Sequence, residues 1–164
     1  MNWTTAKAWV SSLNVGGFTD WRLPTTLIPD TSCSNQGPSN DYYGGFNCTG
    51  SDLGHLFYNE LGGVAGQSII STHNANYNFF SNIIAFDDNT HYWSGTLRSS
   101  GIVWVFRTRD GMQWPGAFSD PEYYSWAVRT GDVGLSGVVP EPSIIWLLLA
   151  GGAGWLGTKA RRRG

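Results

Sequence analysis

The fold is decided by two strand-like stretches, Tyr92-Trp93-Ser94-Gly95-Thr96 and Ile102-Val103-Trp104-Val105-Phe106-Arg107. Both are rich in the aromatic and β-branched residues that favour strands. Ser125-Trp126-Ala127-Val128-Arg129 has the same character, and Ile83-Ile84-Ala85-Phe86 is a shorter strand candidate. Asp110-Gly111 marks a turn between strand-like runs. These stretches predict an antiparallel sheet in the second half of the chain.

Two short helices are expected before this sheet. Apolar residues recur at helical spacing within residues 3–14 and again within residues 53–62. The first pattern stops at Asn14, before Gly16-Gly17. Helices and strands that occupy separate parts of the chain, joined by long irregular connections, predict a single α+β domain.

The end of the chain carries a membrane signal. Residues 143–158, from Ser143 to Thr158, contain no charged side chain. As a helix they would extend about 24 Å, against a bilayer core of about 30 Å. We expect a C-terminal transmembrane helix here; the alternative is a buried core helix. A basic stop follows, which predicts a cytoplasmic C-terminus; it consists of Lys159, Arg161, Arg162 and Arg163.

The tripeptide Pro140-Glu141-Pro142 directly precedes this helix. The end of the chain resembles the PEP-CTERM sorting signal of Gram-negative exported proteins, which consists of such a tripeptide, a short apolar helix and a terminal arginine cluster, in this order. The resemblance implies recognition by an exosortase-type membrane protease and cleavage at or near the tripeptide. It also implies transient anchoring in the inner membrane, followed by release to the cell surface or exterior, usually alongside exopolysaccharide production. Residues 140–164 are therefore assigned to the sorting signal, and residues 133–139 to a Gly-rich linker.

The N-terminus does not match this expectation of export. A signal peptide begins with a basic region followed by an apolar stretch, and residues 1–7 contain no such pattern. We therefore expect the true start of the protein to lie upstream of Met1, so that the N-terminus of the body is truncated.

The two cysteines, Cys33 and Cys48, are 15 residues apart. An even number of cysteines in an outward-facing protein favours a disulfide, which would contribute about 3 kcal/mol for a loop of this size. The alternative is a metal pair, which the spacing and the three histidines support weakly.

The body has a family resemblance of its own. The blocks MNWTTAKAWVSSLNVGGFTDWRLPT (residues 1–25), YWSGT (92–96) and WAVRTGD (126–132) resemble the Lcl C-terminal domain family of exported bacterial proteins. The resemblance covers roughly residues 2–132, with a divergent middle. It implies a single C-type-lectin-like domain over residues 1–132, and the family's best-known member binds sulfated polysaccharides. The fold is also similar to that of formylglycine-generating enzymes, but a disulfide would leave no thiol for catalysis.

Three aromatic residues are the candidates for ligand binding. Trp114 lies in the turn-rich stretch 111–116, and Tyr123 and Tyr124 lie in another predicted loop. Aromatic residues on loops are suited to stacking on a sugar face. Tyr92-Trp93-Ser94 and Trp126 are instead expected in the core.

The block Asp20-Trp21-Arg22-Leu23-Pro24-Thr25 is expected to form a structural corner, with a ligand site as the alternative. Trp21 and Leu23 would point inward. Arg22 would pair with Asp20 or donate to backbone carbonyls.

Catalytic patterns are missing from the sequence. His55, His73 and His91 are scattered, and no metal-ligand spacing or Gly-x-Ser-x-Gly elbow occurs. Asp87-Asp88 beside Asn89 is expected to be a turn, with a calcium loop as the alternative. We expect neither an enzyme nor a cofactor or bound metal.

Charge limits the partners. Charged residues make up 13% of the chain, about half the usual share, and no basic surplus predicts nucleic-acid binding. Before residue 141 six basic side chains face eleven acidic ones. Neutral sugars are therefore favoured over sulfated chains, unless the arginines at positions 98, 107, 109 and 129 cluster.

We expect an exported module that binds extracellular carbohydrate without catalysis. The alternatives are a self-associating matrix protein that binds no sugar and, with less support, an enzyme that acts on polysaccharides.

Overall fold

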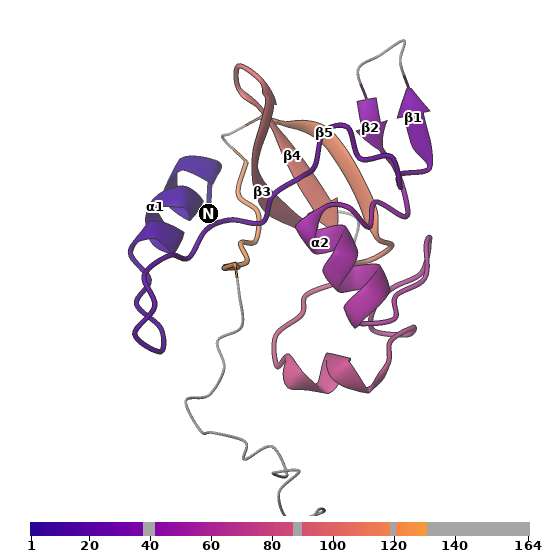
Figure 1. Cartoon of the computed structure of the whole chain (residues 1–164), viewed down its shortest axis with the longest axis horizontal. Coiled ribbons are helices and arrows are strands. Elements are labelled where there is room, and N and C mark those ends of the chain that lie inside the picture. The colour runs from indigo at the N-terminus through magenta and orange to yellow at the C-terminus, as the bar shows by residue number, and fades with distance from the viewer. Residues whose placement is uncertain (38–41, 87–89, 119–120, 131–164) are drawn as a thin grey trace, which may run out of the picture. The chain divides into compact units, whose positions relative to one another are not determined.

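The computed structural model describes residues 1–37, 42–86, 90–118 and 121–130 (Figure 1). Residues 1–130 form one compact unit. The described part is an α+β domain with two short α-helices and antiparallel sheets, as predicted. In chain order its elements are α1 (Trp3–Ser11), β1 (Asn35–Gly37), β2 (Tyr42–Gly44), α2 (Asp52–His55), the π-helical turn η1 (Leu56–Glu60), the 3-10 helix η2 (Ala75–Phe79), β3 (His91–Ser99), β4 (Ile102–Arg107) and β5 (Met112–Phe118).

The central sheet has the strand order β3-β4-β5, and each neighbouring pair is antiparallel. Residues 103–106 of β4 are all buried. Val103 and Val105 belong to one hydrophobic cluster with α1, whereas Phe106 belongs to a second cluster with the α2–η1 segment. The two helices lie on opposite sides of the sheet (Figure 1). Burial on both faces explains why β4 has a continuous apolar run instead of an alternating pattern.

Helix α1 begins where the sequence predicts it and ends at Ser11, three residues before the expected Asn14. Asn2 caps it, because its side-chain oxygen accepts a hydrogen bond from Thr5 N over 2.9 Å. Its buried residues face the sheet, and Trp3 Nε1 donates to Ser94 O over 2.9 Å. This bond fixes the helix to β3.

The second predicted helix, residues 53–62, is present as α2 continued by η1. Leu53, Phe57 and Leu61 are buried, and the Phe57 ring lies 5.6 Å from that of Phe106. The one-sided apolar pattern is therefore confirmed, although the second half winds as a π-helix.

The predicted disulfide between Cys33 and Cys48 is confirmed, and both cysteines are buried. Within the loop that it closes, β1 and β2 pair as a short antiparallel hairpin that the sequence analysis did not predict. Asp30 packs beside the disulfide, where its carboxylate accepts a hydrogen bond from Ser51 Oγ over 2.8 Å.

Two strand predictions are wrong. Residues 83–86 form no strand, because side chains hold them: Ile84 N donates to the Tyr92 hydroxyl over 3.0 Å, and the Thr108 hydroxyl donates to Ile84 O. Residues 125–129 form no strand: the segment leaves β3 at the Tyr92–Tyr124 bridge, and within it Val128 alone makes an isolated bridge, to Arg22.

The loop predicted at residues 111–116 is also wrong. Apart from the turn at Gly111, it belongs to β5, in which Trp114 pairs with Val105. Pro115 and Gly116 lie at a register shift, which is where a strand tolerates both residue types.

Within the described ranges, no helix has the length and apolarity needed to cross a membrane. The predicted linker, the sorting motif, the span Ser143–Thr158 and the basic stop lie outside the described residues, as do Asp87, Asp88 and Asn89.

Candidate functional site

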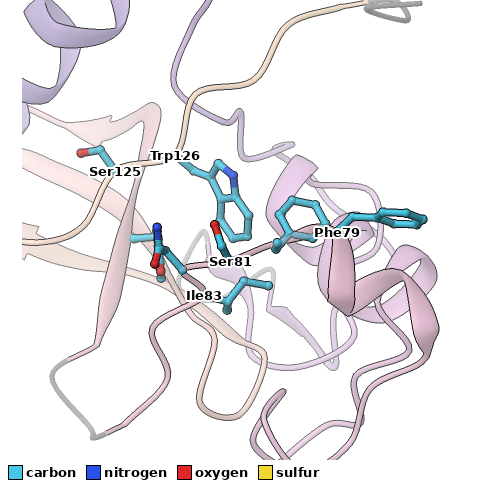
Figure 2. A pocket seen from close by; sticks show the side chains of 8 residues that line it. Phe79, Ser81, Ile83, Ser125 and Trp126 are labelled. Atoms are coloured by element: carbon cyan, nitrogen blue, oxygen red, sulfur yellow. The ribbon is translucent and has the colours of Figure 1, made fainter.

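A groove of about 270 Å³ opens between the η2 region and the segment after Tyr124 (Figure 2). We call it the aromatic groove; it is lined by Phe79, Phe80, Ser81, Asn82, Ile83, Tyr92, Ser125 and Trp126. Figure 2 shows the Trp126 side chain extending toward Ser81 and Ile83, with Phe79 at the outer end. Ser125 points the other way, as expected for neighbouring residues in an extended segment.

Asparagines position the wall of this groove that contains Phe79. The Asn74 side chain caps η2 by accepting from Asn76 N over 2.9 Å. The side-chain amides of Asn74 and Asn76 both donate to Glu60 O, over 2.9 and 3.0 Å. These bonds fasten η2 to the end of η1 and leave the Phe79 side chain 85% exposed.

Packed aromatic rings continue the lining of the groove from Phe80 to Trp126 and Tyr92. Phe80 meets Trp126 edge-on, with ring centroids 5.5 Å apart, and Trp126 lies 5.4 Å from Tyr92. Burial raises the pKa of the Tyr92 hydroxyl, so it remains a neutral phenol at physiological pH. The described residues that line the aromatic groove include no charged side chain.

A second groove of about 520 Å³, the tyrosine groove, lies next to the first. The candidates Tyr123 and Tyr124 both line it. Tyr124 is 43% exposed, while the Tyr123 ring packs between His91 and Trp93, with centroid distances of 4.7 Å to each. The other lining residues are Met1, Ile84, Phe86, Thr90, Glu122 and Ser125.

The third candidate, Trp114, does not join these tyrosines in a groove. It lies within β5 instead of a loop, half-buried and 4.6 Å from the His91 ring. The guanidinium of Arg107 lies 5.4 Å from its ring centroid. Its stacking surface is therefore engaged by side chains of the protein.

The block at residues 20–25 contacts the start of α2, at Asp52, and the segment that contains Arg129. Arg22 pairs with Asp52 at 2.6 Å and donates to Leu23 O over 3.1 Å, so the carbonyl contact is as predicted. The predicted pairing with Asp20 is wrong, because the Asp20 carboxylate binds Arg129 Nε over 2.9 Å. Hydrogen bonding to Arg129 lowers the pKa of Asp20.

A third groove of about 350 Å³ lies between α1 and this corner. Trp21, Arg22 and Lys7 are among the residues that line it. Lys7 Nζ lies 3.6 Å above the Trp3 ring centroid. This groove contains none of the predicted ligand-binding aromatics.

Two of the arginines whose clustering would favour sulfated chains are engaged in ion pairs. Arg107 pairs with Asp110, and Arg129 pairs with Asp20. Their charge is thus largely balanced within the protein.

Among the described residues, one group of potential metal ligands comes together: Asp30, Cys33 and Cys48. The two sulfurs are bonded to each other, so neither is available as a thiolate. His55 contacts Glu60 at 3.2 Å and His73 stacks on Tyr77, which accounts for two of the three histidines.

Sequence reasoning missed the outer wall of the aromatic groove. Residues 63–82 are rich in asparagine and serine and have no periodic apolar pattern, yet Phe79 and Phe80 are neighbours within them. A pair of aromatic residues among asparagines and serines was the signal that could have found the groove. Trp126 was assigned to the core; it is half-buried and packs there while also lining the groove.

Comparisons of the chain with protein-family models, with curated proteins and with solved structures give no match.

Proposed function

We propose that the body is a non-enzymatic module that binds neutral polysaccharide in the aromatic groove. The observation that supports this best is the combination of an exposed Phe79, a half-buried Trp126 and two small polar residues, Ser81 and Asn82, around one concavity. Sugar rings have an apolar face that packs on aromatic rings, and hydroxyl groups that require hydrogen-bond partners. Phe79 and Trp126 would serve the first need, and Ser81 and Asn82 the second.

Charge supports neutral sugars. The described lining of the aromatic groove has no basic side chain to balance a sulfate or a carboxylate. The chain before residue 141 also has more acidic than basic residues. An acidic polysaccharide would therefore be repelled at long range and unpaired at the groove.

Exposure of Phe79 supports a role in binding over a role in stability. A phenylalanine with 85% of its surface in water contributes little to the core, whereas an exposed aromatic beside a concavity is typical of an interaction site. Replacing Phe79 should therefore affect binding and leave folding unchanged.

The test is affinity electrophoresis of the full chain, in a detergent without a sugar headgroup. The gels contain hydroxyethylcellulose, dextran, galactomannan or xylan as neutral polymers, and alginate or heparin as acidic ones. We expect retardation by at least one neutral polymer. The Phe79→Ala variant should bind roughly three to ten times more weakly with unchanged unfolding. Leu97→Ala, which truncates another exposed apolar residue, is the control. Stronger retardation by the acidic polymers would reject the proposal.

Self-association is the second candidate, and one observation favours it. Phe79 and Phe86 are exposed by 85% and 79%, which leaves two large apolar side chains available to another copy. Sedimentation velocity distinguishes the two functions. A matrix protein of this kind would assemble with rising concentration, and Phe79→Ala would prevent the assembly in the absence of sugar.

The C-terminal segment supports a proposal about location. We propose that the protein is exported, held briefly in the inner membrane by residues 143–158 and released by an exosortase. This rests on the tripeptide at residues 140–142, the uncharged span and the basic stop. The resemblance of residues 1–132 to C-type-lectin-like domains is likewise a proposal, and it rests on the quoted sequence blocks.

Cleavage can be tested directly. In a Gram-negative host that carries an exosortase, we expect the C-terminus of the secreted protein to map at or near residues 140–142 by mass spectrometry. Glu141→Ala should block processing and leave the full-length chain in the membrane fraction. Equal processing of both forms would refute the assignment of the motif.

A further inference from the structure

The tyrosine groove and the aromatic groove share a lining residue. Ser125 lines both, and neighbouring residues of the same two segments are divided between them. Ile83 and Trp126 line the aromatic groove, while Ile84 and Tyr124 line the tyrosine groove. The two grooves therefore adjoin at Ser125.

A line of aromatic rings passes beneath the junction. Tyr92 is buried under it, 5.4 Å from the Trp126 ring and 5.6 Å from the Tyr124 ring. The backbone there is fixed as well, because Tyr124 N donates to His91 O over 2.9 Å and Trp93 N donates to Tyr124 O over 3.0 Å. The Trp126 ring in one groove and the Tyr124 ring in the other thus pack on the same buried tyrosine.

Each groove has its own exposed aromatic platform. Phe79 serves the aromatic groove, and Tyr124 and Phe86 serve the tyrosine groove, with exposures of 85%, 43% and 79%. The two platforms belong to different grooves, which share only Ser125 among their described lining residues.

We infer that the two grooves form one binding cleft for an internal stretch of a linear, uncharged polysaccharide chain, with Tyr124 and Phe86 as a second sugar platform. This rests on the proposed function and extends it from one sugar subsite to a chain.

The charge of the second groove sets the ligand class. The charged groups of the described lining residues are one anion, the Glu122 carboxylate, and one cation, the Met1 ammonium, which donates to Tyr123 O over 3.0 Å, so the groove has no net charge to attract an ionic ligand. A carboxylate or sulfate on every sugar would lie close to Glu122. A neutral chain avoids this repulsion, and its hydroxyls can donate to the Glu122 carboxylate.

The test compares chain lengths on the full protein. Oligomers of two and six sugars are prepared from whichever of the four neutral polymers binds tightest, and their affinities are measured by calorimetry. We expect the six-sugar oligomer to bind at least roughly tenfold tighter than the two-sugar oligomer. Tyr124→Ala should remove roughly three- to tenfold of the affinity for the longer oligomer and leave that for the shorter one unchanged. Tyr124→Phe, which keeps the ring, is the matched control.

Tyr124 packs on Tyr92, so a second variant covers the case in which Tyr124→Ala fails to fold. Phe86→Ala removes an exposed side chain and should produce the same length-dependent loss. Glu122→Gln should strengthen binding of alginate relative to the neutral polymer, because it removes the repulsion, and Glu122→Lys should strengthen it further. Equal affinities for the two lengths, or no effect of either platform variant, would overturn the extended cleft. If Phe79→Ala still weakens binding in that case, the single-groove function survives; if no neutral polymer binds, both proposals fail.

Discussion

Tyr58 links the helical segment to the sheet through one hydroxyl group. Its Oη donates to Gly111 O over 2.8 Å, and its ring packs edge-on against Phe57 at 4.8 Å. Burial raises the pKa of Tyr58 to about 12, above the value of about 10 for an unfolded chain. The folded state therefore holds the phenolic proton more tightly than the unfolded state does.

This shift predicts a loss of stability in alkali. The contribution of Tyr58 is fully present below about pH 10 and is lost as the pH rises through about 12. Urea unfolding between pH 8 and pH 12 measures it. Tyr58→Phe should cost about 1 kcal/mol at pH 8, from the lost hydrogen bond, and should decline less steeply in alkali. Tyr92 has a raised pKa too, so a residual decline is expected. Identical slopes for the two proteins would contradict this account.

At the scale of elements, α2 lies directly against the disulfide segment. A Cβ added at Gly54 would overlap the carbonyl oxygen of Cys48, which belongs to backbone and cannot rotate away. We predict that Gly54→Ala destabilises the domain by about 1–3 kcal/mol, although alanine favours a helix more than glycine does. Chemical denaturation measures this, with Gly66→Ala as a control at a glycine that has open space around it. Because Gly66 has a positive φ, the control itself should cost about 1 kcal/mol. A stabilised Gly54→Ala variant would show that α2 does not pack as described.

Elements with a periodic apolar pattern were predictable from the sequence. Helix α1 and the α2–η1 segment follow from one-sided spacing, and β3 and β4 follow from their aromatic and β-branched content. Strand β5 could not be predicted in this way, because Pro115 and Gly116 are typical of loops. Only pairing with β4, at an irregular register, makes them part of a strand.

The two wrong strands have a common cause. Residues 83–86 and 125–129 contain residues that favour strands, but composition does not specify a partner. In the structure, hydrogen bonds to Ile84 come from the hydroxyl groups of Tyr92 and Thr108, and those to Val128 come from the backbone of Arg22. Thr108 and Arg22 are distant in sequence from the segments that they hold. Such contacts form only once the domain has folded.

Part of the candidate site was predictable from the sequence, and part depends on contacts that exist only in the folded domain. Tyr123 and Tyr124 were identified as candidates and line a groove, whereas Trp114 is engaged by His91 and Arg107. Phe79 was missed because its role depends on η2, which asparagine side chains anchor to Glu60. An element such as η2, which is held by side-chain hydrogen bonds, has no periodic apolar pattern from which it could be predicted.

At the scale of the whole molecule, the Cys33–Cys48 disulfide stabilises the side of the domain that the two proposed grooves do not use. Replacing both cysteines by serine should lower the free energy of unfolding by about 3 kcal/mol, the value for a closed loop of about 15 residues. Denaturant titration measures the loss. A folded double variant should still bind polysaccharide with unchanged affinity. Loss of binding in a folded variant would place the site at the disulfide loop instead.

The most direct test of the central claim is nuclear magnetic resonance of the tryptophan indole groups in the full chain. The sample is titrated with the six-sugar neutral oligomer in a detergent without a sugar headgroup. The account predicts a saturable shift of the Trp126 indole signal, while the signal of the fully buried Trp104 stays constant. The Trp126→Phe variant assigns the signal. A silent Trp126 together with a shift at Trp21, which lines the third groove, would contradict the account and move the sugar site beside α1.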